Sequence, residues 1–341
     1  MKNSKKQLAL PMVLAAALLC LLLFALHFQG KKQSSVVVEK KGNGAFTLLC
    51  PKLDHCADAF IMYNDRQAVM IDAGEAGDAD RLLEILRDQG IDTLDALILT
   101  HYDKDHIGGA PAILKAVTVK KCYMTRGAED SEEYRQLFQS LQETRTEQEI
   151  VRETEELALL DAALAIYPPL AETYEKNQDN NLSLIVSVKA SQDSLLFTGD
   201  AQKERVREYV EKQYDGTRFT WLKVPHHGRD KKPVKMLLNC FIPEEAVICS
   251  SEEEPENEKV VELLEEAGVR VELTRKGDRG RFSVSSDGMI QGELRDRGRG
   301  DNYHEQIEEQ DNCGMCLYGI GAFTVGGSFG CAGPGGSRSR W

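Results

Sequence analysis

The sequence predicts an α/β fold in which two mixed β-sheets lie between outer helices. Short apolar runs typical of buried strands alternate with amphipathic helical segments along most of the chain. A chain of 341 residues with 42% hydrophobic content can bury one large core. We therefore expect a single main domain over residues 45–290 rather than two equal domains.

Four helices are expected between the strands. The first is capped by Asp78 and ends at Gly90, and its apolar positions fall on one face. Pro111, after two glycines, favours the start of a short second helix. This short helix covers residues 112–117, and the other two predicted helices cover residues 132–143 and 257–267. Their apolar positions are assigned to the core.

The most informative segment, Thr100–Gly109, reads Thr-His-Tyr-Asp-Lys-Asp-His-Ile-Gly-Gly and directly follows an apolar run. It contains four potential metal ligands within six residues: His101, Asp103, Asp105 and His106. Imidazole and carboxylate groups suit zinc and manganese, and four of them exceed what one metal with an open position usually takes from one segment. The pattern indicates two divalent metal ions (Zn or Mn). A polar surface loop is the simpler alternative.

Two further apolar runs end in potential ligands, which favours the metal site over the surface loop. Residues 195–197 lead to Asp200, and residues 221–224 lead to His226 and His227. Only seven histidines occur, and four of them lie in the segments 101–106 and 226–227.

In order, Thr-His-x-Asp-x-Asp-His-x-Gly-Gly, Phe-Thr-Gly-Asp and Val-Pro-His-His-Gly resemble the metallo-β-lactamase fold, an αββα sandwich. The match is to the branch that includes the hydrolase domain of ComEC-type DNA-uptake proteins. In that branch an aspartate, here Asp103, replaces the second histidine of the superfamily motif. Weaker matches at residues 58–74 and 179–184 resemble the opening hairpin and the segment before the Gly-Asp strand.

The resemblance implies a ligand set. His101 and Asp103 would hold one metal, Asp105 and His106 the other, and Asp200 would bridge them. Asp105 would also orient the attacking water or accept its proton.

Further candidate site residues lie outside this ligand set. His226 is preferred as the last ligand because it comes first after the strand. His227 would then be a catalytic residue that either supports a ligand or faces the substrate. Asn181 stands where many members place a third histidine of the first metal, and Asp72 would support the metal loop. Turn and cap roles are equally open for both residues.

One departure from the family concerns charge. A Gly-His-Pro segment is common after the strand at residues 246–250, but here the place reads Glu252-Glu253-Glu254-Pro255. An acidic loop facing the site would repel a phosphate. Arg229, Lys231, Lys232 and Lys235 form a local basic cluster, although the net charge of −13 lacks the bulk signal of a nucleic-acid binder.

The predicted function is metal-dependent hydrolysis of a phosphodiester or related ester, with DNA as one candidate substrate. Fold alone does not name the bond. A β-lactamase or a thioesterase is one alternative, and a non-catalytic binding protein with a vestigial metal site is another.

The ends of the chain carry separate predictions. Residues 1–30 are expected to be a transmembrane anchor or signal segment, because an uncharged apolar stretch follows Lys2, Lys5 and Lys6. This predicts a single-pass protein of the cell membrane with an extracytoplasmic catalytic domain, or a secreted one if the segment is cleaved. Residues 31–44 are expected to be a linker and residues 291–341 a Gly- and Cys-containing tail. Cys50 and Cys56 could pair outside the cell.

Overall fold

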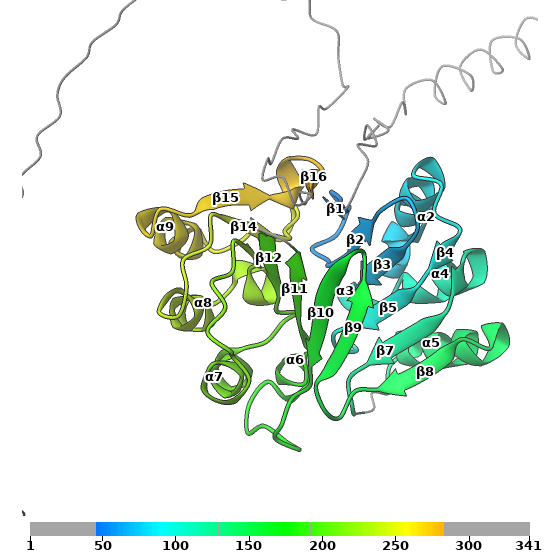
Figure 1. Ribbon diagram of the computed structural model, residues 1–341, viewed down its shortest axis with the longest axis horizontal. Helices are drawn as coiled ribbons and strands as arrows, with labels where there is room; N and C mark the ends of the chain where they lie inside the picture. The colour runs from blue at the N-terminus through cyan, green and yellow to red at the C-terminus, as the bar shows by residue number, and fades with distance from the viewer. Residues whose placement is uncertain (1–45, 128–129, 191–192, 283–341) are drawn as a thin grey trace, which may run out of the picture. The chain divides into compact units, whose positions relative to one another are not determined.

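The computed structural model describes residues 46–127, 130–190 and 193–282, which form two mixed sheets packed face to face with helices on their outer sides (Figure 1). One buried cluster lies between the sheets and draws residues from both of them, including Phe60 and Phe197. Two other clusters lie between each sheet and its helices. The order helix, sheet, sheet, helix confirms the predicted fold class.

The strands of the first sheet are, in spatial order, β16 (Arg279–Phe282), β1 (Thr47–Cys50), β2 (Phe60–Tyr63), β3 (Ala68–Ile71), β5 (Ala96–Leu99), β7 (Lys121–Met124) and β8 (Glu147–Ile150). The strands of the second are β15 (Arg270–Leu273), β14 (Glu245–Ile248), β13 (Trp221–Lys223), β12 (Asp193–Phe197), β11 (Ile185–Ala190), β10 (Ala162–Tyr167) and β9 (Glu155–Leu159). A small parallel pair joins β4 (Thr93–Leu94) to β6 (Thr118–Val119).

Each sheet is half parallel and half antiparallel. Strands β3, β5, β7 and β8 are parallel, as are β12, β13, β14 and β15. Parallel strands covered on both faces carry continuous apolar runs, which explains the fully buried sequence Ala-Leu-Ile-Leu of β5.

The helices divide between the two outer faces. The first sheet is covered by α2 (Ala79–Asp88), α4 (Ala110–Ala116) and α5 (Glu132–Thr144), and the second by α7 (Lys203–Lys212), α8 (Lys231–Leu238) and α9 (Glu258–Glu266) (Figure 1). Short helical turns are η1 (Ala76–Asp78), α3 (Lys104–Ile107), α6 (Gln178–Asn181), η2 (Pro225–Gly228) and η3 (Thr274–Lys276).

The four predicted helices are present, with two differences. Helix α4 begins at Ala110 rather than Ala112, because Pro111 fits within its first turn. Asp78 precedes α2, but its carboxylate does not cap that helix. Its oxygens accept the backbone N–H groups of Asp54 and Glu75, at 3.0 and 3.1 Å.

Cys50 and Cys56 are both free thiols, contrary to the proposed pairing. Cys50 packs in the cluster between the sheets, whereas the Cys56 thiol donates to the carbonyl of Cys249 at 3.7 Å. The two side chains therefore have different partners.

The predicted segments 1–30, 31–44 and 291–341 lie outside the described residues. Across the described ranges, no helix combines the length and the apolar character needed to cross a bilayer. On this finding the expected location in the cell membrane is corrected.

Candidate metal centre

The site lies where β5, β12 and β13 end. Gly199, just after β12, packs against Thr100, just after β5. Gly199 has a φ of +50°, and a Cβ placed on it would lie 2.9 Å from the Thr100 Cβ. A larger residue would clash there and would also be strained. The glycine of the Gly-Asp motif therefore allows the first and second ligand segments to meet.

Asp72, at the end of β3, holds the loop that follows β5. Its Oδ1 accepts the Thr100 backbone N–H at 2.7 Å, and its Oδ2 accepts the Thr100 hydroxyl at 2.8 Å. Oδ2 also lies 2.9 Å from Nδ1 of His106. Both oxygens are thus occupied by the loop, so Asp72 supports the loop rather than facing the centre.

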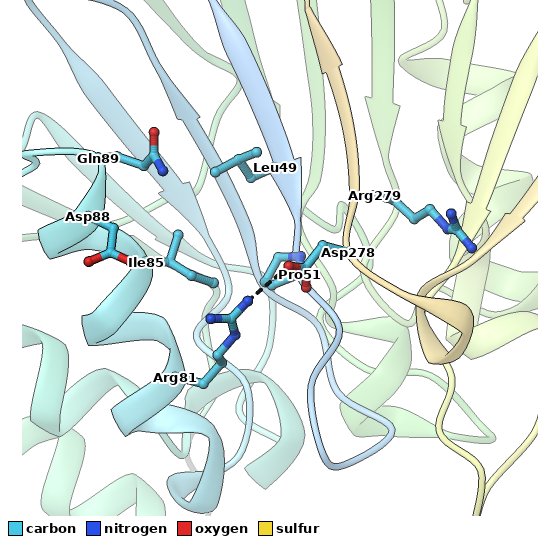
Figure 2. Close-up of a pocket in the computed structure, with 8 residues that line it drawn as sticks. All are labelled: Leu49, Pro51, Arg81, Ile85, Asp88, Gln89, Asp278 and Arg279. Atoms are coloured by element: carbon cyan, nitrogen blue, oxygen red, sulfur yellow. Dashed lines mark hydrogen bonds and ion pairs between the residues drawn. The ribbon is translucent and has the colours of Figure 1, made fainter. Parts of the chain in front are cut away.

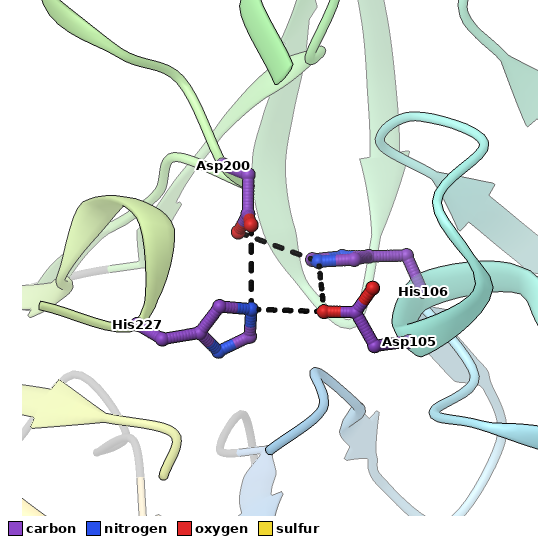
Figure 3. A group of neighbouring side chains, drawn as sticks. All are labelled: Asp105, His106, Asp200 and His227. Carbon is purple, nitrogen blue, oxygen red and sulfur yellow. Dashed lines mark hydrogen bonds and ion pairs between the residues drawn. The ribbon is translucent and has the colours of Figure 1, made fainter. Parts of the chain in front are cut away.

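Four ligand-type side chains meet in one buried group: Asp105, His106, Asp200 and His227 (Figure 3). One donor atom from each lies within 4.8 Å of the others. Oδ2 of Asp105 is 3.1 Å from Nε2 of His227 and 3.5 Å from Nε2 of His106. Asp200 faces both imidazoles, with Oδ1 3.3 Å from His106 Nε2 and Oδ2 3.3 Å from His227 Nε2. Three segments distant in sequence supply this group.

In His106 and His227 the same ring nitrogen, Nε2, faces the carboxylates of the group, and Nε2 of His227 lies within hydrogen-bond distance of Asp105. Nδ1 of His106 faces a carboxylate oxygen of Asp72, and Nδ1 of His227 lies 3.0 Å from the carbonyl oxygen of Cys249. Both partners only accept, so each Nδ1 carries a proton. In the neutral ring the lone pair is then on Nε2, which faces Asp105 and Asp200. This is the arrangement in which outer partners usually fix a metal-binding histidine.

His101 and Asp103 form a second, sparser half of the site. Nε2 of His101 lies 3.4 Å from Oδ2 of Asp103, and the His101 and His106 rings are 4.1 Å apart between centroids. The Thr100 hydroxyl is 3.2 Å from Nδ1 of His101, and because it donates to Asp72 it accepts from His101. Nε2 of His101 is therefore also free. The Asp103 side chain is 32% exposed, so this half is open to solvent.

The adjacent histidine His226 has a different environment. Its Nε2 lies 3.9 Å from Asp200 Oδ2, and its side chain is 23% exposed. Its Nδ1 lies 3.2 Å from the amide nitrogen of Gln202, whose oxygen accepts from Asn177. An amide nitrogen donates, so Nδ1 of His226 accepts and its proton sits on Nε2. The geometry thus groups His227, rather than the expected His226, with the other ligand-type residues.

The turn that separates the two histidines is strained. His226 and His227 have φ values of +47° and +52°, and Gly228 follows at +68°. Positive φ is uncommon for residues other than glycine and clusters at functional sites. The turn directs His227 inward, where it is 2% exposed, and leaves His226 at the rim.

Asn181, expected either at the first metal or in a turn, caps a helix. Its Oδ1 accepts the backbone N–H groups of Gln202 and Arg205, at 3.1 and 3.2 Å, and its Nδ2 donates to the Lys176 carbonyl at 2.9 Å. The side chain is fully engaged at the start of α7. The half of the site around His101 therefore gains no ligand from this residue.

Two buried charged residues at the site were not among the sequence-based candidates. Asp58 and Lys223 are both 0% exposed, and they form an ion pair. Lys223 also lies 3.3 Å from Asp200 Oδ1. Asp58 begins the segment 58–74 that resembles the opening hairpin of the family, and Lys223 stands in an apolar run. A lysine among strand residues was the one available signal.

The mutual charges shift the ionisation of the site strongly. Burial raises the pKa of Asp200 and Asp105, but the neighbouring histidines outweigh it and hold both pKa values below the usual range. Burial lowers the pKa of His106 and His227, but the surrounding carboxylates, Asp200 foremost, raise both pKa values well above the usual one. Burial lowers the pKa of His226. The ionised carboxylates of Asp105 and Asp200 suit the binding of cations.

The acidic loop next to the site is paired with arginines. Glu254 forms an ion pair with Arg229, which directly follows the His-His-Gly turn. Glu252 lies 3.6 Å from Arg275. The Asn257 backbone N–H donates to the Gly228 carbonyl at 3.2 Å, which joins the two loops. The repulsion expected from this loop is therefore partly offset by its own counter-charges.

A separate surface pocket is not part of this centre. Figure 2 shows its lining residues, which are Leu49, Pro51, Arg81, Ile85, Asp88, Gln89, Asp278 and Arg279. None of them is a candidate ligand. Its Arg81 and Asp278 pair with each other at 2.9 Å.

The residues present fit divalent metal ions. Nε2 of His101 and Nε2 of His106 are buried nitrogens without a hydrogen-bond partner among the described residues. Such atoms are costly to bury unless something binds them. Imidazole nitrogens together with carboxylate oxygens form a donor set that zinc and manganese accept.

A family profile described as the metallo-beta-lactamase superfamily matches residues 57–251, more than half of the chain. The chain therefore belongs to this superfamily, as its motifs predicted. It is 30% identical over 193 residues to ComE operon protein 3 of Bacillus subtilis (strain 168). That alignment covers 56% of this chain but only 24% of the relative, so the chain spans about a quarter of that protein.

Two solved structures match this chain at low sequence identity. CmlA, a diiron β-hydroxylase from Streptomyces venezuelae, matches with a TM-score of 0.47 and 13% identity, over 71% of this chain and 54% of CmlA. YhfI, a metallo-beta-lactamase fold protein from Bacillus subtilis, matches with a TM-score of 0.44 and 12% identity, over 69% of this chain and 99% of YhfI.

Proposed function

We propose that this chain is a hydrolase that uses two divalent cations, zinc or manganese, to cleave a phosphodiester bond. The observation that carries the proposal is the group in Figure 3, where three distant segments direct the Nε2 atoms of two imidazoles and two carboxylates at one point. The proposed ligands are Asp105, His106 and His227 for one cation, His101 and Asp103 for the other, and Asp200 for both.

Two residues have proposed roles in the reaction besides binding. When bound, a pair of cations lowers the pKa of a shared water toward about 7 and offsets the charge that develops at the attacked centre. The Asp105 side chain is 21% exposed, so its carboxylate can orient that water or accept its proton. His226 presents an Nε2–H at the rim, where it can donate to an oxygen of the substrate.

The phosphodiester substrate rests on the motif around Asp103 and is supported by the similarity to ComE operon protein 3. Arg229 lies at the edge of the His-His-Gly turn, where a cation suits an anionic substrate. The net charge of −13 argues against a broad electrostatic grip on nucleic acid, so DNA is one candidate substrate among phosphodiesters.

The test is a substrate panel on the full chain loaded with manganese or zinc. The panel contains bis(p-nitrophenyl) phosphate, single-stranded DNA, a thioester and nitrocefin. We expect turnover of a phosphodiester that is lost in Asp200→Asn and kept in Asp215→Asn, an exposed carboxylate paired with Lys189. Turnover of only the thioester or nitrocefin would contradict the proposal. No turnover by protein with two bound cations would favour a binding role.

A further inference from the structure

Lys223 is a fully buried lysine at the end of β13, directly behind the candidate metal centre. Its Nζ donates to the Gly199 carbonyl at 2.8 Å and lies 3.3 Å from Asp200 Oδ1, and it forms an ion pair with Asp58. Trp221, two residues earlier on the strand, packs in the cluster between the sheets. Because strand side chains alternate, Lys223 points to that same face and reaches the sheet edge beneath the ligands.

Asp58 links this lysine to the other ligand segments. Its Oδ1 is 3.6 Å from Nδ1 of His227, and its Oδ2 is 3.8 Å from Nδ1 of His106. Its backbone N–H donates to the Asp105 carbonyl at 3.1 Å. Asp58 therefore lies near the Nδ1 atoms of both imidazoles, on the side away from their Nε2 atoms.

The charges at the centre indicate why a lysine is buried here. Five carboxylates surround the site, those of Asp58, Asp72, Asp103, Asp105 and Asp200. Histidines that bind a cation through Nε2 must be neutral, and with Lys223 as the ammonium of the group four negative charges are then left. Two divalent cations would balance these four charges. A buried ammonium is unfavourable unless it is paired and hydrogen-bonded, and here both conditions are met.

We infer that Lys223, held by Asp58, is a positioning residue that fixes the orientation of the Asp200 carboxylate, the proposed ligand of both cations. Lys223 contacts Oδ1 of Asp200 and so restrains rotation of the carboxylate, while Oδ2 faces His227. Removing Lys223 removes this restraint on Asp200 and leaves Asp58 buried without its lysine counter-ion. This inference rests on the metal centre of the proposed function and is independent of which bond is cleaved.

The sign of the effect separates positioning from simple charge. Loss of a positive charge next to a cation site would by itself tighten cation binding. Loss of a positioning contact weakens it, and outer contacts of this kind typically change metal affinity by about 10- to 100-fold. The two explanations therefore predict opposite changes in affinity.

The experiment compares manganese binding to the full-length wild type, Lys223→Met, Lys223→Gln and Asp58→Asn, with Lys189→Met as the control. Lys189 is a lysine on β11 that pairs with Asp215, outside the site. The readouts are Mn(II) stoichiometry and affinity by equilibrium dialysis, and the EPR spectrum, which distinguishes coupled manganese pairs from isolated ions. Thermal unfolding of the chelated proteins reports folding separately.

We expect Lys223→Met and Lys223→Gln to bind Mn(II) about 10- to 100-fold more weakly and to lose the coupled-pair signal, while Lys189→Met matches the wild type. If Lys223→Met does not fold, Lys223→Gln and the double variant Lys223→Met/Asp58→Asn, which removes both charges together, carry the test. A coupled signal with unchanged or tighter binding in a folded Lys223 variant would overturn the inference. A wild type that binds no manganese would overturn the metal centre itself.

Discussion

The two halves of the candidate metal centre come from one loop but are enclosed very differently. Asp105 and His106 are joined by His227 from a second segment, whose ring is fixed by the Cys249 carbonyl. His101 and Asp103 gain no such partner, and the Asp103 side chain is 32% exposed. Asp200, from a third segment, faces the enclosed half.

This difference indicates that the two halves of the centre have different roles. A cation with more protein ligands is held more tightly and serves as a fixed point, whereas an open position leaves room for water and substrate. The helix cap made by Asn181 explains the asymmetry, because its side chain is used at α7. We therefore expect two cation sites of unequal affinity.

The largest effect is expected from His227→Ala, compared with His226→Ala. Loss of His227 removes a ligand from the enclosed half, so we expect the loss of bound metal and a fall in activity beyond the roughly 100-fold typical of outer residues. His226→Ala should slow turnover and keep both cations. Metal analysis of the two purified variants checks this. Equal loss of metal in both would remove the distinction between the histidines.

A second comparison uses His101→Ala, which affects only the open half. We expect one cation per chain instead of two, with the tighter dissociation constant changed by less than about tenfold. Competition with a fluorescent chelator measures both constants. If the tighter site were lost in this variant, the assignment of the two halves would be reversed.

The third prediction concerns pH, because the enclosed half holds two histidines with raised pKa values. In chelated protein their stabilising effect is complete below about pH 6.5 and is lost as pH rises through their folded pKa values. The lowered pKa values of Asp105 and Asp200 contribute stability above about pH 3.8, which is lost as pH falls through the folded pKa values.

We therefore expect the chelated protein to become less stable above about pH 6.5, by about 1.4 kcal/mol for each unit of pKa shift. Metal-loaded protein should gain stability over the same range, because the ligands must lose protons to bind. Thermal unfolding at a series of pH values with and without chelator checks both trends. Parallel curves would show that the histidines do not bind the cations.

Asn181→Ala should affect the fold rather than the metals. Replacing a capping side chain typically costs about 0.5–2 kcal/mol. We expect a loss of unfolding free energy in this range, measured by urea denaturation, with an unchanged cation count. Loss of one cation without loss of stability would instead make Asn181 a ligand of the open half.

The smallest effect is expected from Glu254→Gln, at the rim. Exposed ion pairs contribute about 0–1 kcal/mol, so releasing Arg229 should lower KM for an anionic phosphodiester by no more than about fivefold. The matched variant Glu253→Gln serves as the control. A higher KM in Glu254→Gln would show that the carboxylate itself helps to bind the substrate.

Much of the fold could be predicted from the sequence, because β5, β12 and β13 are short apolar runs that end in polar motifs. Those motifs also located the segments that meet at the site. The parallel strands β12 and β13 end at one edge of their sheet, and the loop after β5 in the other sheet packs against that edge. The helices followed from the periodicity of their apolar positions, although the cap expected from Asp78 does not form. These are local signals.

The details that depend on tertiary contacts could not be predicted. Position in the motif favoured His226, but a turn with positive φ directs His227 inward. Lys223 and its partner Asp58 are 165 positions apart in the sequence, and no local pattern connects them. The Asn181 cap likewise depends on α7, whose first residue is Lys203.

The most direct test of the unequal two-cation centre is an anomalous difference map from crystals of the full chain grown with manganese. We expect a strong peak among Asp105, His106, Asp200 and His227, and a second peak of lower occupancy beside His101 and Asp103. Peaks of equal occupancy would contradict the asymmetry. Manganese bound only elsewhere would contradict the centre as a whole.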